Sequence, residues 1–221
     1  MYVVRGEREG EGADEAGRAG VAELLALASS GEPAIRVWRP GRCVAFGRRD
    51  TRAAGYEEAR AHARVEGFEP VERSVGGRAV AYTASTVAFA RADPVEELRA
   101  GMNERYARAT SAVQRALWHL GVPAEHGEPP ESFCPGDHSL QYEGKLVGVA
   151  QRVTSEAALA SGVLLVDDRE EISHVLDGVY RALDAPFDPE SVGTVADAGG
   201  ETAWERVREE LEYCLATAGA E

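Results

Sequence analysis

Residues 144–152 read Gly-Lys-Leu-Val-Gly-Val-Ala-Gln-Arg, an apolar strand that begins with the chain's only lysine. Strand alternation with a period of two predicts one face with Lys145, Val147 and Val149 and an opposite face with Leu146, Gly148 and Ala150. Small residues on the second face would let another strand or a ligand chain pack closely. An ammonium at the start of the strand could stabilise an oxygen that gains charge during a reaction. The alternative is that Lys145 is a chance residue in a chain that otherwise uses arginine.

A second stretch, residues 73–80, reads Arg-Ser-Val-Gly-Gly-Arg-Ala-Val and joins two predicted strands. Paired glycines permit positive φ angles and allow a ligand to approach the backbone closely. The flanking Arg73 and Arg78 could bind a phosphate or a carboxylate in bidentate fashion. The alternative is a simple hairpin turn.

Composition favours one soluble globular domain. The 221 residues carry a net charge of −14, and no apolar run approaches the length of a membrane span. Such self-repulsion disfavours nucleic acid as a partner and is typical of a halophile-like acidic protein. The N-terminus lacks a signal-peptide pattern, so we expect a cytoplasmic protein. Three cysteines without a CxxC pair and five histidines without metal-ligand spacing predict no bound metal.

Hydrophobic periodicity predicts alternating helices and strands. The expected helices span residues 14–30, 56–66, 94–120, 170–183 and 202–217. The expected strands span residues 34–38, 43–47, 70–73, 86–90, 139–143, 145–152 and 162–166. This order predicts an α+β fold, in which helices flank a mixed, largely antiparallel sheet. We expect a flexible tail over residues 1–13 and a single domain over residues 14–221.

In this order and spacing, the two stretches resemble the lipoate–protein ligase A and octanoyltransferase branch of the biotin/lipoate protein ligase superfamily. The resemblance covers roughly residues 15–197, most of the chain. Trp38-Arg39-Pro40 followed by Val44-Ala45-Phe46-Gly47 is similar to the early hairpin of that family. A biotin–protein ligase is disfavoured, because the chain lacks a Gly-Arg-Gly-Arg loop.

The resemblance implies an acyltransferase that attaches a lipoyl or octanoyl group to one lysine of a lipoyl domain. The implied acceptors are the lipoyl domains of 2-oxoacid dehydrogenases or the glycine cleavage H protein. The acyl tail would lie in an apolar tunnel between the glycine stretch and the lysine strand. Lys145 is the implied catalytic residue, which contacts the acyl carbonyl and the phosphate of an acyl-adenylate. The implied substrate-binding residues are Arg73, Ser74, Val75, Gly76, Gly77, Arg78, Gly148 and Ala150.

Two departures from the family pattern leave the acyl donor open. Ligases carry a His-Asp pair just after the glycine stretch, where this chain has Ala81-Tyr82-Thr83. They also carry an accessory domain that supports adenylate formation, and we expect none over residues 198–221, which have room only for the helix over residues 202–217. ATP with Mg²⁺, a separate accessory subunit and a ready-made thioester or adenylate therefore all remain open.

Cys134 provides a second mechanism. It precedes the lysine strand in Ser-Phe-Cys-Pro-Gly-Asp, residues 132–137, and some octanoyltransferases of this superfamily hold the acyl group on a cysteine in a similar loop. A thiol there could accept an octanoyl group from acyl carrier protein, and Asp137 or His138 could assist. The alternatives are an ordinary half-buried loop cysteine and, for the whole chain, a non-catalytic acyl-binding relative. Cys43 and Cys214 are expected in the core.

Overall fold

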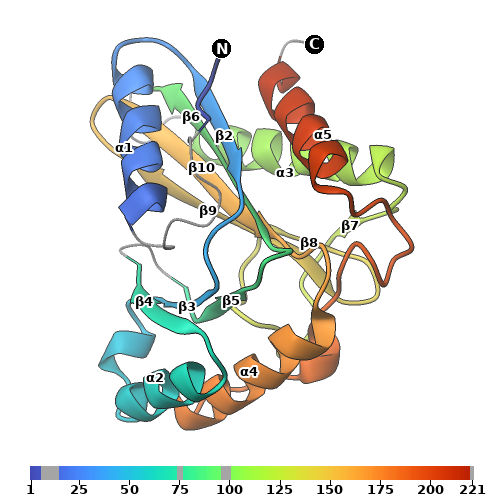
Figure 1. Ribbon diagram of the computed structural model, residues 1–221. Helices are drawn as coiled ribbons and strands as arrows, with labels where there is room; N and C mark the ends of the chain where they lie inside the picture. Colours follow the sequence, from blue (N-terminus) through green and yellow to red (C-terminus); the bar gives the residue numbers. More distant parts are fainter. Residues whose placement is uncertain (6–14, 74–76, 96–100, 220–221) are drawn as a thin grey trace.

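The structure is a computed structural model that describes residues 1–5, 15–73, 77–95 and 101–219. Its main sheet has the order β1-β2-β6-β10-β9-β8-β7 (Figure 1). The strands are β1 (Tyr2–Val3), β2 (Ala34–Trp38), β6 (Val87–Pro94), β7 (Glu125–His126), β8 (Ser139–Gln141), β9 (Lys145–Val153) and β10 (Ala157–Leu164). The β1–β2 pair is parallel and the other pairs of this sheet are antiparallel.

Helices cover both faces of this sheet because successive strand residues point to opposite sides. On one face, Ala90 of β6 packs in a cluster with Leu24 of α1 (Glu15–Ser29). On the other face, Phe89 packs with Leu117 of α3 (Met102–His119) and Leu211 of α5 (Trp204–Thr217). Each such fully buried side chain stabilises the fold by about 1.5–3 kcal/mol.

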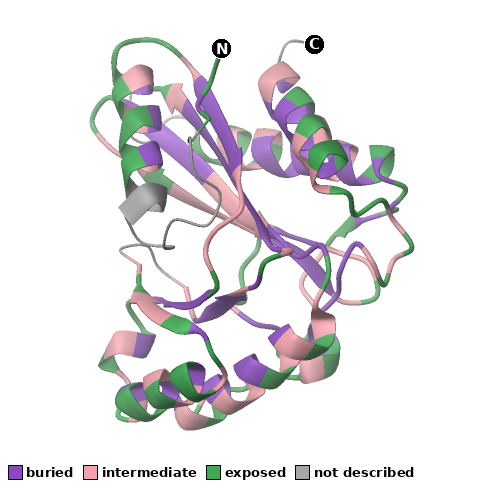
Figure 2. Ribbon diagram, viewed as in Figure 1, coloured by how far each residue is buried: buried purple, intermediate pink, exposed green. Residues whose placement is uncertain are grey.

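A second, smaller layer lies beneath the main sheet. It contains the three-stranded sheet β4-β3-β5, formed by β3 (Cys43–Phe46), β4 (Glu69–Glu72) and β5 (Val80–Tyr82). Helices α2 (Tyr56–Val65) and α4 (Arg169–Ala182) pack below it, and Figure 2 shows their buried faces turned toward the strands. Short 3₁₀ turns, η1 (Asp50–Arg52) and η2 (Pro189–Ser191), complete the described elements.

The α+β fold with a mixed, largely antiparallel sheet is confirmed. The expected helix over residues 94–120 is wrong at its start, because Pro94 ends β6 and the described part of α3 begins at Met102. In β6, Pro94 pairs with Ala157 at the strand end, where the missing N–H is tolerated. Residues 6–13 of the expected tail lie outside the described residues, while Tyr2 and Val3 pair with β2. None of the described helices is long and apolar enough to cross a membrane.

Candidate active site

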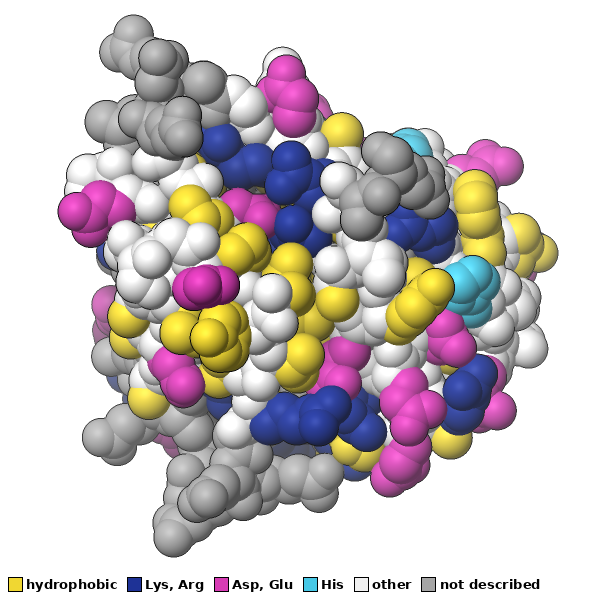
Figure 3. All heavy atoms as spheres, turned by 90° about the horizontal axis from the view of Figure 1, so that it is seen from above, with side chains coloured by type: hydrophobic (Ala, Val, Ile, Leu, Met, Phe, Trp, Pro, Cys, Tyr) yellow, Lys and Arg dark blue, Asp and Glu magenta, His cyan; other side chains and the backbone are white. Residues whose placement is uncertain are grey.

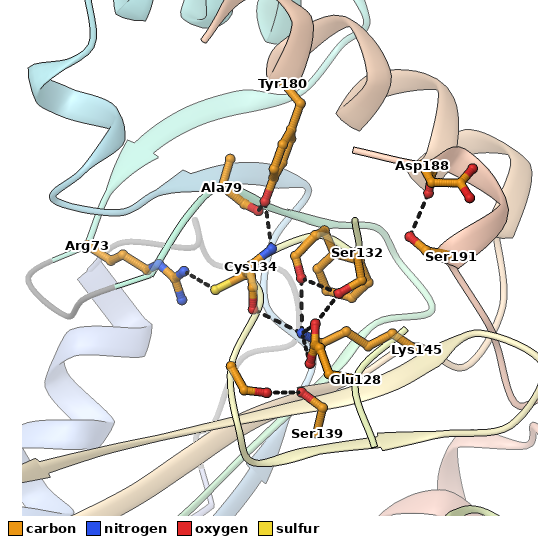
Figure 4. Close-up of polar contacts among 12 residues, drawn as sticks. Arg73, Ala79, Glu128, Ser132, Cys134, Ser139, Lys145, Tyr180, Asp188 and Ser191 are labelled. Carbon is orange, nitrogen blue, oxygen red and sulfur yellow. Dashed lines mark hydrogen bonds and ion pairs between the residues drawn. The ribbon is translucent and has the colours of Figure 1, made fainter. Parts of the chain in front are cut away.

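The two stretches singled out in the sequence meet at Cys134, between the large and the small sheet (Figure 4). Arg73 follows β4, and its Nη2 lies 3.1 Å from Cys134 Sγ. The same nitrogen donates a hydrogen bond to the carbonyl oxygen of Arg78. A guanidinium at this distance can donate a charge-assisted hydrogen bond to a thiolate. The structure thus brings the glycine stretch and the cysteine loop, 61 residues apart in the chain, into direct contact.

Gly77 lies beside this contact and must be a glycine. Its φ is +96°, and a Cβ at this position would lie 2.7 Å from Cys134 Sγ and 3.0 Å from Arg73 Nη2. Both the backbone angle and the space therefore exclude a side chain. Of the other expected substrate-binding residues, Ser74, Val75 and Gly76 lie outside the described residues.

Arg78, the second arginine of the stretch, is held by a buried carboxylate that the sequence analysis missed. Arg78 Nη1 lies 3.4 Å from Asp50 Oδ1, and the Gly47 amide donates to Asp50 Oδ2 at 3.0 Å. Burial raises the pKa of Asp50, and the Gly47 amide and Arg78 oppose this shift. A Cβ on Gly47 would lie 2.0 Å from the Gly77 carbonyl oxygen. The early hairpin thus supports the glycine stretch directly.

The Cys134 loop is fixed by the hydroxyl of Tyr180 on α4. The Cys134 amide donates to this hydroxyl at 2.6 Å, and the hydroxyl donates to the Ala79 carbonyl at 3.0 Å. Cys134 has a φ of +42°, which a residue with a side chain rarely adopts. Tyr180 is buried, and this burial raises the pKa of its hydroxyl. One side chain therefore ties the cysteine loop to the strand that follows the glycine stretch.

Lys145 is buried, and protein groups bind its ammonium. Its Nζ lies 2.9 and 3.0 Å from the two carboxylate oxygens of Glu128. It also donates to the carbonyl oxygens of Phe133 at 3.0 Å and Cys134 at 2.9 Å. Burial lowers the pKa of Lys145, and Glu128 opposes this shift. The Ser132 hydroxyl bonds to Glu128 as well (Figure 4). In this structure, Lys145 holds the backbone of the cysteine loop, and its contact with an acyl carbonyl stays a prediction.

Lys145 does not lie on the expected face of β9, which was the face opposite Gly148. Gln141 pairs with Lys145 while Leu140 pairs with Val147, so the β8–β9 register shifts by one residue. Such a bulge breaks the alternation of side chains. A Cβ on Gly148 would lie 3.5 Å from Lys145 Cε, so the expectation that these two residues occupy opposite faces is wrong.

Of the two predicted acyl-binding residues of β9, Gly148 pairs with Val163, and Ala150 belongs to a row of small residues across three strands. Ala150 pairs with Ser161 of β10, and Ser161 pairs with Ala90 of β6. Gly148 and Ala150 are only half-buried.

The remaining candidates are a stacked ring, an exposed carboxylate and two buried cysteines. The His138 ring stacks on Tyr106 of α3, with ring centroids 3.7 Å apart. Asp137 is exposed. Cys43 and Cys214 are buried, as expected, and neither forms a disulfide with another described cysteine.

A cavity of about 670 Å³ lies on the outer side of Glu128. Its lining includes Glu125, Glu143 and Glu190, but neither Cys134 nor Arg73. We therefore place the candidate active site at the Arg73–Cys134 contact, where reactive groups converge, and not in this acidic cavity.

One group of possible metal ligands occurs among the described residues, away from Cys134. His119, Glu210 and Cys214 place their ligand atoms within 4.8 Å of one another. Arg206 contacts Glu210 at 2.9 Å, and Arg115 donates to the Cys214 carbonyl at 3.3 Å. Two guanidinium groups beside the cluster oppose the binding of a further cation.

The face seen from above carries side chains of both charges (Figure 3). Lys and Arg side chains gather in groups there, with hydrophobic side chains between them and Asp and Glu side chains nearby.

Comparison with known protein families gives a match over most of the chain. Residues 21–212 match the family described as "Lipoyl protein ligase A/B catalytic domain". An octanoyl-[GcvH]:protein N-octanoyltransferase of Kyrpidia tusciae is 32% identical over 126 residues, which are 57% of this chain and 43% of that protein. A lipoyl-[GcvH]:protein N-lipoyltransferase of Listeria monocytogenes is 22% identical over 148 residues, which are 66% of this chain and 53% of that protein. The matches thus span about half the length of these relatives.

Solved structures share the fold. A lipoate-protein ligase A bound with ATP superposes with a TM-score of 0.75 and 22% identity, covering 98% of this chain and 84% of that one. A putative lipoate protein ligase from Thermoplasma acidophilum with bound lipoic acid gives a TM-score of 0.71 and 21% identity, covering 98% and 85% of the two chains. At this identity, these likenesses establish the fold alone.

Proposed function

Because the chain belongs to the lipoyl protein ligase A/B catalytic domain family, we propose that it transfers a lipoyl or octanoyl group to a lysine of a lipoyl-domain protein. We propose further that Cys134 carries the acyl group between donor and acceptor. The contact between Cys134 Sγ and the Arg73 guanidinium, at 3.1 Å, is the observation that carries this proposal. A guanidinium at hydrogen-bond distance can donate to a thiolate, which is the nucleophilic form of a cysteine.

The proposed acyl transfer has two steps. In the first, the Cys134 thiolate attacks the acyl carbonyl of the donor and a carbon–sulfur bond forms. The bond from the carbonyl carbon to the donor's nitrogen or sulfur breaks, and the leaving group takes a proton from solvent and departs as the amine or thiol. In the second, the neutral amine of the acceptor lysine attacks the thioester. The new amide bond then forms, a proton leaves the nitrogen, and the cysteine thiolate is released.

The role we propose for Lys145 is to position Cys134. Its ammonium binds the carbonyl oxygens of Phe133 and Cys134, and Glu128 neutralises its charge. Glu128 is itself only partly exposed, so this ion pair is shielded from water. The adenylate mechanism instead requires Lys145 to leave these acceptors and to bind the acyl carbonyl.

The acyl chain would lie along β9, over Gly148 and Ala150. Gly148 and Ala150 sit on the strand that starts at Lys145, so a chain bound there has its carbonyl end near the cysteine loop. Apolar contact with these residues would supply the affinity for the hydrocarbon tail.

The names of the curated relatives specify GcvH as the carrier of the octanoyl or lipoyl group. We propose the same class of carrier, a lipoyl-domain protein such as the glycine cleavage H protein or a 2-oxoacid dehydrogenase domain. The donor is an acyl-loaded carrier, either a lipoyl-domain protein or acyl carrier protein.

The test is a reconstituted transfer to a purified lipoyl domain at molar salt. Three donors are compared: octanoyl-GcvH, octanoyl-acyl carrier protein, and lipoate with ATP and Mg²⁺. Transfer from either octanoyl carrier that is lost in Cys134→Ser supports the proposal. Transfer only with ATP, undiminished in Cys134→Ser, would replace it by the adenylate mechanism. No transfer from any donor, with acyl-chain binding retained, would identify a non-catalytic relative.

A further inference from the structure

The acyl transfer proposed above needs a hydrogen-bond donor for the oxygen that becomes negative when Cys134 attacks. Two groups beside the sulfur are already engaged with other acceptors. The Cys134 amide donates to the Tyr180 hydroxyl, and the Lys145 ammonium donates to Glu128 and to two backbone carbonyls. Using either one would first require breaking a hydrogen bond of the folded site.

Arg73, in contrast, has a hydrogen-bond donor, Nε–H, that no described acceptor binds. Its Nε is buried and has no hydrogen-bond partner among the described residues. In the rigid fork of a guanidinium, Nε–H and one Nη2–H leave the same edge side by side. Nη2 is the atom that contacts Cys134 Sγ and the Arg78 carbonyl. The orphan donor therefore lies inside the site, next to the reacting sulfur.

A buried donor without an acceptor costs about 1–3 kcal/mol, so it calls for an explanation. The Gly77 backbone packs closely against the same two groups. A Cβ on Gly77 would lie 2.7 Å from Sγ and 3.0 Å from Nη2, so only a glycine leaves the sulfur and the guanidinium in place. An acyl carbonyl attacked by Sγ must place its carbon next to the sulfur, and its oxygen is then only two bonds from Sγ.

From this arrangement we infer that Arg73 is a catalytic residue, whose Nε–H binds the carbonyl oxygen of the acyl group and stabilises the oxyanion during both transfer steps. The inference rests on the proposed thioester mechanism. In each step, the attacking group adds to the carbonyl carbon and the electron pair of the double bond moves to oxygen. The Arg73 guanidinium neutralises that charge. The carbonyl reforms when the leaving amine or thiol departs from the carbon, so Arg73 itself gains and loses no proton.

The test compares two reactions of the same sulfur in the full chain. Acylation by p-nitrophenyl octanoate passes through an oxyanion, whereas alkylation by iodoacetamide does not. Rate constants are measured for the wild type, Arg73→Gln and Arg73→Lys, with Arg206→Gln on α5 as the control arginine variant. Peptide mass mapping assigns the product to Cys134, and Cys134→Ser gives the background.

We expect Arg73→Gln to lower acylation by roughly 10²–10³-fold, as the loss of an oxyanion donor does, and to lower alkylation by a much smaller factor. Arg73→Lys keeps the charge but lacks the Nε–H edge, so alkylation should persist while acylation falls. Arg206→Gln should change neither rate. If Arg73→Gln does not fold, Arg73→Lys alone decides the question.

The ratio of the acylation rate to the alkylation rate distinguishes a failure of the Arg73 inference from a failure of the thioester mechanism. An unchanged ratio in the Arg73 variants would mean that Arg73 affects only the thiol, and it would overturn the inference while leaving Cys134 as the acyl carrier. A wild type that is alkylated but never acylated at Cys134 would overturn the thioester mechanism itself.

Discussion

Replacing Glu128 by Gln tests the ion pair that fixes the cysteine loop. Lys145 is fully buried, and Glu128 is the only carboxylate among its described hydrogen-bond partners. Removing one partner of a buried pair outright costs about 3–5 kcal/mol. Gln retains one acceptor oxygen, so we expect the lower cost of a lost charged hydrogen bond, about 1.5–3 kcal/mol. For a chain of this length, 1 kcal/mol corresponds to about 2–4 °C in Tm, so Glu128→Gln should melt roughly 3–12 °C below the wild type.

The difference in stability between Glu128→Gln and the wild type should depend on pH, because the Lys145 ammonium titrates. Burial already lowers the pKa of Lys145, and Glu128 is the main group that opposes this shift. Without Glu128, the folded-state pKa falls further below the unfolded value. In the interval between the two values, the unfolded state binds more protons, so the free energy of unfolding rises with pH. The deficit of Glu128→Gln should therefore shrink as the pH rises from 7 towards the unfolded pKa of lysine.

Thermal melts at several pH values in molar salt provide the measurement, and Glu125→Gln is the matched control. Glu125 is exposed on β7 and lines the same outer cavity. Its variant should melt like the wild type at every pH. A Glu128→Gln protein whose Tm matches that of the wild type, or whose deficit is the same at every pH, would refute the assignment of a buried Lys145–Glu128 pair.

Three further predictions concern the geometry of the cysteine loop. Tyr180→Phe removes the acceptor of the Cys134 amide, so the free energy of unfolding should drop by about 1–3 kcal/mol in denaturant melts, and transfer should slow. Gly77→Ala would place a methyl group 2.7 Å from the sulfur and should strongly lower acylation, while Gly136→Ala in the cysteine loop, with nothing within 4 Å of its Cβ, should keep it; equal activities would contradict the assignment of Gly77 to the site. Lys145→Arg keeps the charge but cannot match the compact ammonium site, so both Tm and transfer should fall, and normal transfer would show that the point charge is dispensable.

Local patterns in the sequence predicted the helices and strands well. Apolar spacing placed α2, α4 and α5 within about two residues of their observed ends. Pro94 misled the prediction because a proline fits the first turn of a helix and also the end of a strand. The bulge that moves Lys145 to the side of Gly148 depends on pairing with β8, which strand alternation alone does not reveal.

The candidate site was predictable only in part. Arg73, Gly77 and Cys134 stand in recognisable motifs, so their types and neighbours indicated chemistry. Tyr180 lies 46 residues from Cys134, and it reads as one more apolar position of a helix until the fold brings it to the loop. Glu128 has no local signal, whereas Asp50, three residues after Gly47, fits the side-chain-to-backbone turn that it forms.

The acyl group on Cys134 is the central claim, and intact-protein mass measured after incubation with an octanoyl-loaded carrier tests it most directly. The wild type should gain the mass of one octanoyl group, the increment should disappear on treatment with hydroxylamine, and subsequent addition of a lipoyl domain should transfer it to that domain. Cys134→Ser should gain no thioester. A wild type that modifies lipoyl domains from this donor without ever carrying the octanoyl mass, or a Cys134→Ser variant that transfers at the wild-type rate, would contradict the account.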